Sequence, residues 1–487
     1  MNWRFVTQSL GKFLLGYAAV LSICLLLALI DRSGSERAFL YTVATCALAG
    51  LAMSRLPIGN KITIGIREGY CIVLDIWFLA TIFGAMPLYV HGAIPNMVSA
   101  WFESVSGLTT TGATVIADVE ALPRALLLWR SLMHWLGGVG IIMLFVAVLP
   151  NMGVGVVNLV KAEASGPTTE KLVPRMKDTA IRLWIIYVCL TLLQILLLMV
   201  VAKIDLFEAI NYSMSAMACG GFATKNASVA YFDNPMMELI IATFMIIAGG
   251  NFNLYMHVWR RGLRVLKDNT EFVTYLGIMF TGLLFVSADV FVFEEYKFTF
   301  TNFRDTLFQV VSFLTGTGFA SANFEAWPEI SKTVLIMLMF FGGCAGSTTG
   351  GLKVIRVVLT CKLIWAEIKR TLHPRMVENI KLDGRSLESG VLNSVIRFVA
   401  LYMLTVCIAT VLVAATGMSF MDSLCATLAT IGNVGLGFGI VGPSSNAGNM
   451  PVAAQFILSW CMLLGRLEFF TLLVVLQRDF WRANKGW

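Results

Sequence analysis

The segment Thr110-Thr111-Gly112-Ala113 recurs in related form three more times, as Cys219-Gly220-Gly221-Phe222, Gly316-Thr317-Gly318-Phe319 and Asn433-Val434-Gly435-Leu436. We call these segments loops 1 to 4, in chain order. Each loop lies between apolar stretches long enough to cross a bilayer, and the central glycines recur after 109, 97 and 117 residues. Such an interval is too long for a soluble solenoid repeat, but it suits two membrane helices that flank a re-entrant loop. Four equivalent loops around one axis predict a pore.

The composition assigns most of the chain to a membrane. Of its 487 residues 57% are hydrophobic and 13% are charged, and the mean hydropathy is +0.78. A spanning helix needs about 20 mostly apolar residues. Stretches of this kind predict ten crossings, near residues 11–30, 37–55, 69–91, 126–150, 179–202, 236–258, 272–294, 331–364, 391–415 and 452–477. The first follows Arg4 and Lys12 without a small-residue cleavage site, so we expect it to be retained.

Positive charges gather in alternate loops between the predicted crossings. Lys and Arg cluster after the second, fourth, sixth, eighth and tenth crossings, whereas acids such as Asp118 and Asp205 occupy the other loops. Because short cytoplasmic loops carry an excess of Lys and Arg, we expect both termini in the cytoplasm. The acidic outer mouth would concentrate cations. The net charge of +7 therefore reflects topology and does not indicate a nucleic-acid partner.

Alignment of the four central glycines also brings earlier residues into register. Thirteen residues before the glycine stand Ser99, Glu208, Asp305 and Asp422, and six before it stand Ser106, Ser215, Ser312 and Ala429. An acceptor or acid ahead of an apolar helical run is an N-cap or first-turn residue. Each segment therefore predicts a short helix that enters the membrane from outside and ends in its loop. The negative end of that helix would point at the pore, which suits a cation.

The loops are the candidate ion-binding site. For any one loop the alternative is a Gly-rich turn between helices, because short motifs often occur by chance. Irregular backbone at membrane depth is tolerated where it lines a cavity or is buried in protein, and glycine accepts a positive φ. Rings of carbonyl dipoles can then replace the hydration shell of a monovalent ion. The predicted ion-binding residues are Thr110, Thr111, Gly112, Cys219, Gly220, Gly221, Gly316, Thr317, Gly318, Asn433, Val434 and Gly435.

The predicted crossing at 331–364 is interrupted by small residues. The run reads Gly342, Gly343, Cys344, Ala345, Gly346, Ser347, Thr348, Thr349, Gly350 and Gly351, and we call it the small-residue segment. Ten residues this small and polar cannot hold a straight helix against lipid. One interpretation is a kinked helix packed closely against its neighbours, since small residues are frequent at such contacts.

Several polar residues lie inside apolar runs. Arg466 is one, and an ionisable residue there faces a cavity or a partner. Glu468 is a poor partner within the helix because residues i and i+2 point to different faces. An ion pair with another helix is the structural alternative for Arg466. We interpret His134 and Asn251 as packing residues inside helices and assign them no role.

These motifs resemble the Trk/Ktr/HKT superfamily of potassium transporters, and specifically its TrkH-type membrane subunit. The resemblance covers essentially the whole chain and rests on TTTGATVI (109–116), LPRALLLWRS (122–131), HWLGGVGI (134–141), GGFAT (220–224), GGCAGSTTGGLK (342–353), GNVGLGFG (432–439) and GRLE (465–468). It implies an all-α polytopic membrane protein with four pseudo-symmetric helix, pore loop, helix repeats around a central pore. The implied division is a two-helix extension at 1–66 and repeats at 67–150, 151–265, 266–385 and 386–487.

The resemblance also implies roles for the site residues. Gly112, Gly221, Gly318 and Gly435 would be the selectivity-filter glycines; in the family, four glycines go with potassium preference and a serine in the first loop with sodium permeation. The small-residue segment would be a flexible loop that blocks or opens the pore below the filter, with Lys353 as its candidate anchor. Arg466 would project into the permeation path, where its charge raises the barrier for cations.

The leading functional hypothesis is uptake of K⁺ across a bacterial inner membrane, and the alternative is a sodium-coupled or sodium-permeable transporter. No nucleotide-binding fingerprint is present, so we expect nucleotide only on a partner and no cofactor in this chain. The resemblance implies a homodimer and a cytosolic TrkA-type nucleotide-binding regulatory subunit.

Other classes of function have less support. Ten cysteines lie mostly in apolar stretches without metal-site spacing, so neither a disulfide framework nor a zinc site is expected. An integral membrane enzyme needs clustered catalytic groups, whereas the four His are widely separated, so we do not expect an enzyme. A purely structural membrane subunit does not account for four aligned loops.

Overall fold

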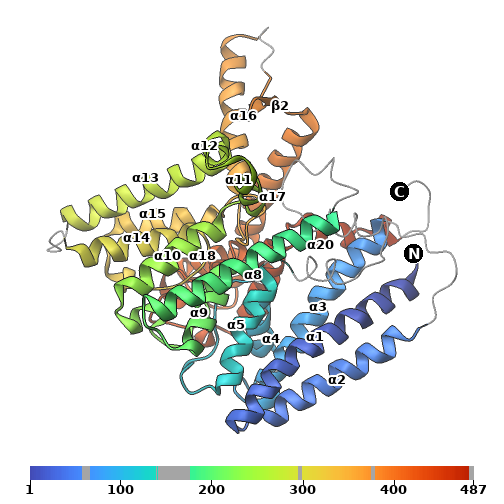
Figure 1. Cartoon of the computed structure of the whole chain (residues 1–487). Helices are drawn as coiled ribbons and strands as arrows, with labels where there is room; N and C mark the ends of the chain where they lie inside the picture. The colour runs from blue at the N-terminus through green and yellow to red at the C-terminus, as the bar shows by residue number, and fades with distance from the viewer. Residues whose placement is uncertain (57–65, 139, 141–175, 294–298, 375–378, 482–487) are drawn as a thin grey trace.

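The computed structural model describes residues 1–56, 66–138, 140, 176–293, 299–374 and 379–481 (Figure 1). Helices dominate this part of the chain, so the all-α prediction is confirmed. The strands within it are β1 (Lys381–Leu382) and β2 (Arg385–Ser386), which form one small antiparallel hairpin.

The first two helices pair before the repeats begin. Helices α1 (Trp3–Asp31) and α2 (Glu36–Ser54) cross closely because glycines face each other at the contact. A Cβ at Gly50 would lie 3.0 Å from the carbonyl oxygen of Gly11, so a larger residue would push the helices apart. This pair packs beside α3 at one edge of the molecule (Figure 1).

Four units follow, each with a long helix, a short helix and a second helix. The long helices are α3 (Ile66–His91), α8 (Met176–Val200), α13 (Thr270–Phe293) and α17 (Ser389–Ala414). The short helices are α4 (Met97–Leu108), α9 (Leu206–Met217), α14 (Phe300–Leu314) and α18 (Phe420–Ile431). The second helices are α5 (Arg124–Gly138), α10 (Pro235–Gly249) with α11 (Phe252–Arg261), α15 (Glu329–Phe340) with α16 (Val354–Leu372), and α19 (Val452–Arg466) with α20 (Phe470–Leu476).

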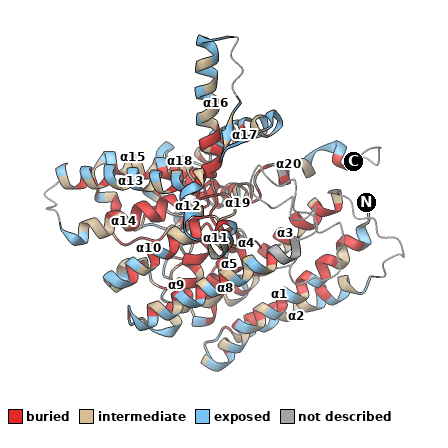
Figure 2. Ribbon diagram, turned by 45° about the horizontal axis from the view of Figure 1, so that its top comes forward, coloured by how far each residue is buried: buried red, intermediate tan, exposed pale blue. Residues whose placement is uncertain are grey.

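Short elements complete the described chain. They are α12 (Arg264–Asp268), α21 (Arg478–Trp481) and the 3-10 turns η3 (Ser228–Phe232), η4 (Phe324–Ala326), η5 (Gly439–Val441) and η6 (Ala447–Asn449). Burial concentrates where the short helices converge, whereas the outer half of α16 projects from the body and is exposed (Figure 2).

The second helices differ from the predicted continuous crossings. By length and apolarity, six described helices can cross a membrane, or seven if α10 and α11, which meet at 95°, form one span. The predicted crossing at 236–258 breaks at Gly250, and Asn251 caps α11 at this break, so its placement inside a helix was wrong. The crossing at 452–477 breaks at Glu468 and Phe469, which both have positive φ. The crossing at 126–150 lies partly outside the described residues.

The short helices begin close to where the sequence predicts. Ser99, Glu208 and Asp422 lie in the first turn, and the capping side chains three residues earlier are Asn96, Asp205 and Ser419. The Asp422 amide donates to the Ser419 hydroxyl, and that hydroxyl donates in turn to the Asp422 carboxylate. The first-turn prediction is wrong for Asp305, because α14 already begins at Phe300.

The two described ends of the chain meet. The rings of Trp3 and Trp481 stack with their centroids 6.0 Å apart, so α1 begins where α21 ends. Both ends therefore lie on the same side of the helical body (Figure 1).

Candidate functional site at the four loops

Each loop turns through the left-handed region at two equivalent positions. The φ values two residues before the glycine are 58° at Thr110, 55° at Cys219, 64° at Gly316 and 52° at Asn433. The values at the central glycines are 86°, 75°, 76° and 71° for Gly112, Gly221, Gly318 and Gly435. Residues other than glycine rarely adopt this conformation. Three of them do so here in register, which indicates that the surrounding fold imposes one shape on all four loops.

The loops close a ring in chain order. A Cβ at each central glycine would lie closer than 3.0 Å to a backbone carbonyl oxygen of the next loop, a separation that real Cβ atoms do not reach. The facing carbonyls are Gly220 for Gly112, Thr317 for Gly221, Val434 for Gly318 and Thr111 for Gly435. Each carbonyl belongs to the residue just before its own central glycine. Loop 4 thus returns to loop 1, and only glycine fits at the four contacts.

Hydrogen bonds fix each loop to its own short helix. The amide before each central glycine donates to the carbonyl six residues before that glycine, in the pairs Thr111 to Ser106, Gly220 to Ser215, Thr317 to Ser312 and Val434 to Ala429, at 2.8–3.0 Å. Because the backbone of the sixth residue makes this bond, Ala429 serves as well as the three serines.

The facing carbonyls are mostly left free. In the described part of the chain, the carbonyl oxygens of Thr111, Thr317 and Val434 accept no hydrogen bond, although these residues are buried. The Gly220 carbonyl is different because it accepts the amide of Phe222 at 3.0 Å. Buried carbonyls without a donor are suited to coordinate a cation.

Side chains tie the loops to one another. The Asn433 amide nitrogen donates to the Thr111 hydroxyl at 2.9 Å and to the Met462 carbonyl at 3.1 Å, so loop 4 is linked to loop 1. The residue just before loop 1, Thr109, pairs its hydroxyl with that of Thr111 at 2.8 Å, and the residue just before loop 3, Thr315, pairs with Thr317 at 2.7 Å.

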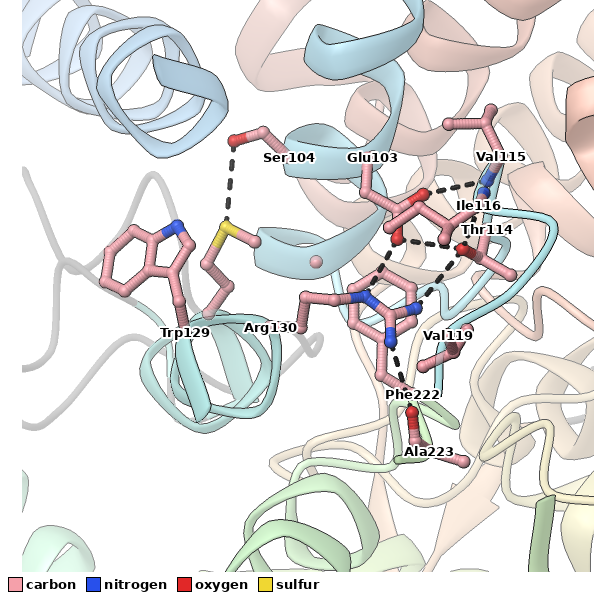
Figure 3. A network of polar contacts seen from close by, with 12 residues as sticks. Glu103, Ser104, Thr114, Val115, Ile116, Val119, Trp129, Arg130, Phe222 and Ala223 are labelled. Atoms are coloured by element: carbon pink, nitrogen blue, oxygen red, sulfur yellow. Dashed lines mark hydrogen bonds and ion pairs between the residues drawn. The ribbon is translucent and has the colours of Figure 1, made fainter. Parts of the chain in front are cut away.

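A buried ion pair braces loop 1 against loop 2 (Figure 3). Arg130 Nε lies 3.0 Å from Glu103 Oε1, and both side chains are almost fully buried. Glu103 also accepts the Thr114 hydroxyl and the Val115 amide, just after loop 1. Arg130 Nη1 donates to the Ala223 carbonyl, just after loop 2, at 3.1 Å. Every charged atom therefore has a partner, as burial of a charge requires.

The small-residue segment is a loop, so the kinked-helix interpretation is wrong. Its base is closed by a hydrogen bond of 2.8 Å from the Gly342 amide to the Leu352 carbonyl. The buried Glu271 carboxylate accepts the amides of Ala345 and Ile355 at 2.6 and 3.3 Å. One side chain of α13 thus holds the segment and the start of α16.

The small-residue segment packs directly against two of the four loops. The Thr348 hydroxyl lies 3.1 Å from the Met217 carbonyl and 3.2 Å from Cys219 Sγ. A Cβ at Gly350 would lie 2.5 Å from Asn433 Oδ1. The segment therefore contacts loops 2 and 4 directly.

Two cations hold the small-residue segment. Lys353 Nζ is buried and donates to the carbonyl and hydroxyl of Thr349. Arg466 donates to the Thr348 carbonyl at 2.7 Å and to the carbonyls of Gly137 and Gly138 at the end of α5. The sequence-predicted gating residues therefore lie together.

Glu468 pairs with Arg356 of α16 at 2.6 Å, in agreement with its being a poor partner for Arg466 within the helix. The sequence did not predict the roles of Glu103 and Arg130 or the contacts of His134. All three are ionisable residues in apolar helices, and this feature of the sequence could have indicated them.

Known proteins share this architecture. The model of the TrkH family, described as a cation transport protein, matches residues 35–481. The chain is 38% identical over 486 residues to the Trk system potassium uptake protein TrkH of Escherichia coli (strain K12), covering 99% of this chain and 100% of that protein. It is 31% identical over 485 residues to the Trk system potassium uptake protein TrkI of Halomonas elongata, covering 99% of this chain and 97% of that protein. The crystal structure of the potassium transporter TrkH from Vibrio parahaemolyticus is similar, with a TM-score of 0.89 and 33% sequence identity. The match covers 99% of this chain and 100% of that one.

Proposed function

The chain belongs to the TrkH family of cation transport proteins, and from this membership we propose that it takes up K⁺ across a bacterial inner membrane. The observation that carries the proposal is the closed ring of loops 1 to 4, in which three of the four facing carbonyls are buried and accept no hydrogen bond from the described residues. The membrane potential would drive K⁺ inward with about 2.3 kcal/mol per charge per 100 mV. The family is one of transporters, so the chain is not an enzyme.

The ion-binding residues are the three that end at each central glycine. They are Thr110, Thr111, Gly112, Cys219, Gly220, Gly221, Gly316, Thr317, Gly318, Asn433, Val434 and Gly435. Their carbonyls replace the water around K⁺, and the short helices direct their negative ends toward the ion. The presence of all four glycines favours K⁺ over the sodium-permeable alternative.

Below these residues, the small-residue segment acts as the gate. It packs against loops 2 and 4, and Arg466 holds it through the Thr348 carbonyl. The closed position blocks the path, and the charge of Arg466 adds an electrostatic barrier for a cation. Opening requires release of these hydrogen bonds.

The wider assembly follows the same proposal. The repeats divide at 67–150, 151–265, 266–385 and 386–487, after an extension at 1–66. Both termini lie in the cytoplasm, supported by the contact between Trp3 and Trp481 and by the basic loops. Relatives are named as members of a Trk system, which supports a partnership with other Trk components. The nucleotide-binding partner of the TrkA type and the homodimer are the finer part of the proposal and rest on the family resemblance.

Growth on limiting K⁺ tests this function. A bacterium without its own K⁺ uptake systems would express this chain with its cognate cytosolic partner. We expect rescue by the wild type and weakened K⁺ selectivity in Gly112→Ser, because a side chain there meets the Gly220 carbonyl. Gly16→Ser is the matched control, since its Cβ would meet nothing within 4 Å. No rescue despite membrane expression would contradict K⁺ uptake.

A further inference from the structure

Helix α5 lies against both loop 1 and loop 2. A Cβ at Gly137 would collide with the Leu108 carbonyl at the end of α4, and one at Gly138 would lie 2.8 Å from Ala218 Cα. The backbone of α5 thus touches the ends of α4 and α9, the two short helices that precede these loops. Any side chain projecting here from α5 can set the position of one loop relative to the other.

His134 is such a side chain, and it is fully buried. Its Nδ1 lies 2.6 Å from the Gly107 carbonyl, in the last turn of α4, and its Nε2 lies 3.1 Å from the amide of Phe222, the last residue of loop 2. A carbonyl only accepts and an amide N–H only donates, so Nδ1 carries the proton and Nε2 is the acceptor. One neutral tautomer therefore joins repeat 1 to repeat 2.

The ring of Phe222 is held from two sides by the same helix. The guanidinium carbon of Arg130 lies 4.0 Å from its centroid, and the imidazole of His134 stacks on it at 4.2 Å. Residues four apart lie on one face of a helix, so α5 presents both groups together. Gly220 leaves room for this clamp, because a Cβ there would lie 2.6 Å from His134 Cγ.

The Phe222 amide is shared between two acceptors. It donates to His134 Nε2 at 3.1 Å and to the Gly220 carbonyl at 3.0 Å. That carbonyl is the loop 2 member of the ring, and its equivalents in the other loops, Thr111, Thr317 and Val434, accept no hydrogen bond within the described residues. Without the imidazole, the amide would bond the Gly220 carbonyl alone and draw it from its place in the ring.

We propose that His134 is a positioning residue for ion selectivity, which keeps the Gly220 carbonyl available by accepting the Phe222 amide. The inference rests on the proposed function of loops 1 to 4 and deepens it. His134 touches no ion; it acts through the backbone of loop 2.

The test compares two variants, each of which keeps one of the two hydrogen bonds that the imidazole makes. Asn at position 134 reaches the Gly107 carbonyl but not the Phe222 amide, whereas Gln extends to the amide. Uptake of radioactive K⁺ and Na⁺ is measured in cells lacking other K⁺ uptake systems, as a ratio that is independent of protein level. We expect His134→Asn to lower the K⁺/Na⁺ ratio by about tenfold, the effect of one lost hydrogen bond, and His134→Gln to retain most of it.

Three controls make the outcome specific. His257→Asn changes an exposed His and should leave the ratio unchanged. Gly112→Ser reports on the loops themselves. A changed ratio in Gly112→Ser beside an unchanged ratio in His134→Asn would overturn the inference alone, whereas unchanged ratios in both would overturn the proposed function of the loops. If His134→Asn does not fold, Phe222→Leu removes the clamped ring but keeps the amide, so the inference expects an unchanged ratio there; a ratio lowered by about tenfold would show that the ring and not the amide positions loop 2, and would overturn the inference.

Discussion

At the scale of the residue, the ring depends on four glycines, because glycine has no Cβ atom. Each central glycine faces a backbone carbonyl of the next loop, and backbone cannot move aside as a flexible side chain can. Each glycine also has a positive φ, which strains any other residue. Space and conformation therefore demand glycine independently at all four positions.

Gly435→Ala tests this demand at the contact that closes the ring. The added methyl group would collide with the Thr111 carbonyl, so we expect K⁺ uptake to fall by at least about tenfold, given the cost of overpacking. Gly16→Ala, on an exposed face of α1, should retain uptake. The measurement is the rate of K⁺ uptake at equal membrane expression of the two variants. Normal uptake by Gly435→Ala would exclude the tight contact.

The Glu103–Arg130 pair makes a prediction about stability. Arg130→Met leaves a buried carboxylate without its cation, so we expect a loss of about 3–5 kcal/mol. The double variant Glu103→Gln/Arg130→Met should recover part of that loss, because no buried charge remains unpaired. Lys332→Met, which breaks a pair with the exposed Glu329, should cost at most about 1 kcal/mol.

Thermal unfolding in detergent measures these differences. A Tm for Arg130→Met no lower than that for Lys332→Met would show that the buried pair does not brace the loops.

Some residues of the site could be predicted from sequence and others could not. The central glycines are recognisable because the same φ requirement recurs four times in one register. The role of His134 depends on Gly107 and Phe222, which lie far apart in sequence, so its local context resembles that of a packing residue. The pairing of Glu103 with Arg130 was not predictable either, because the two residues lie on different helices, 27 residues apart.

At the scale of the element, the second helices are broken where the site needs irregular backbone. The break between α15 and α16 forms the small-residue segment, and the carbonyls at the end of α5 accept Arg466. The short helices were predictable, because a polar first-turn residue marks the start of three of them and a central glycine lies four residues after the end of each. The start of α14 was misplaced because Asp305 lies inside the helix. The break at Gly250 was not, because the apolar run continues through it and only Asn251 signals a new cap.

Arg466→Ala is expected to increase K⁺ flux. The substitution removes the hydrogen bonds that hold Thr348 to α5 and removes a positive charge beside the path. Arg478→Ala, at an exposed position in α21, should leave flux unchanged. Flux is measured as K⁺ uptake into liposomes at equal protein content, with and without the cytosolic partner. Equal flux in wild type and Arg466→Ala would refute the gating role.

At the scale of the whole molecule, the chain returns to its starting side. The stacking of Trp3 on Trp481 requires an even number of crossings between them. Green fluorescent protein fused to either terminus should therefore give the same result in both fusions, and with the proposed cytoplasmic termini both should fluoresce, because it matures only in the cytoplasm. Fluorescence from only one of the two fusions, at equal expression, would contradict the shared side.

The contacts that close the ring join parts of the chain made at very different times. Asn433 bonds Thr111 across 322 residues, and Gln455 bonds Ser99 across 356. A chain leaving the ribosome therefore inserts loop 1 long before its last neighbour exists. During synthesis the membrane holds an incomplete ring that cannot coordinate an ion on all sides. Under the proposed function, conduction would begin only when the final repeat has been translated and docked, so a nascent chain would not dissipate the potential that drives uptake.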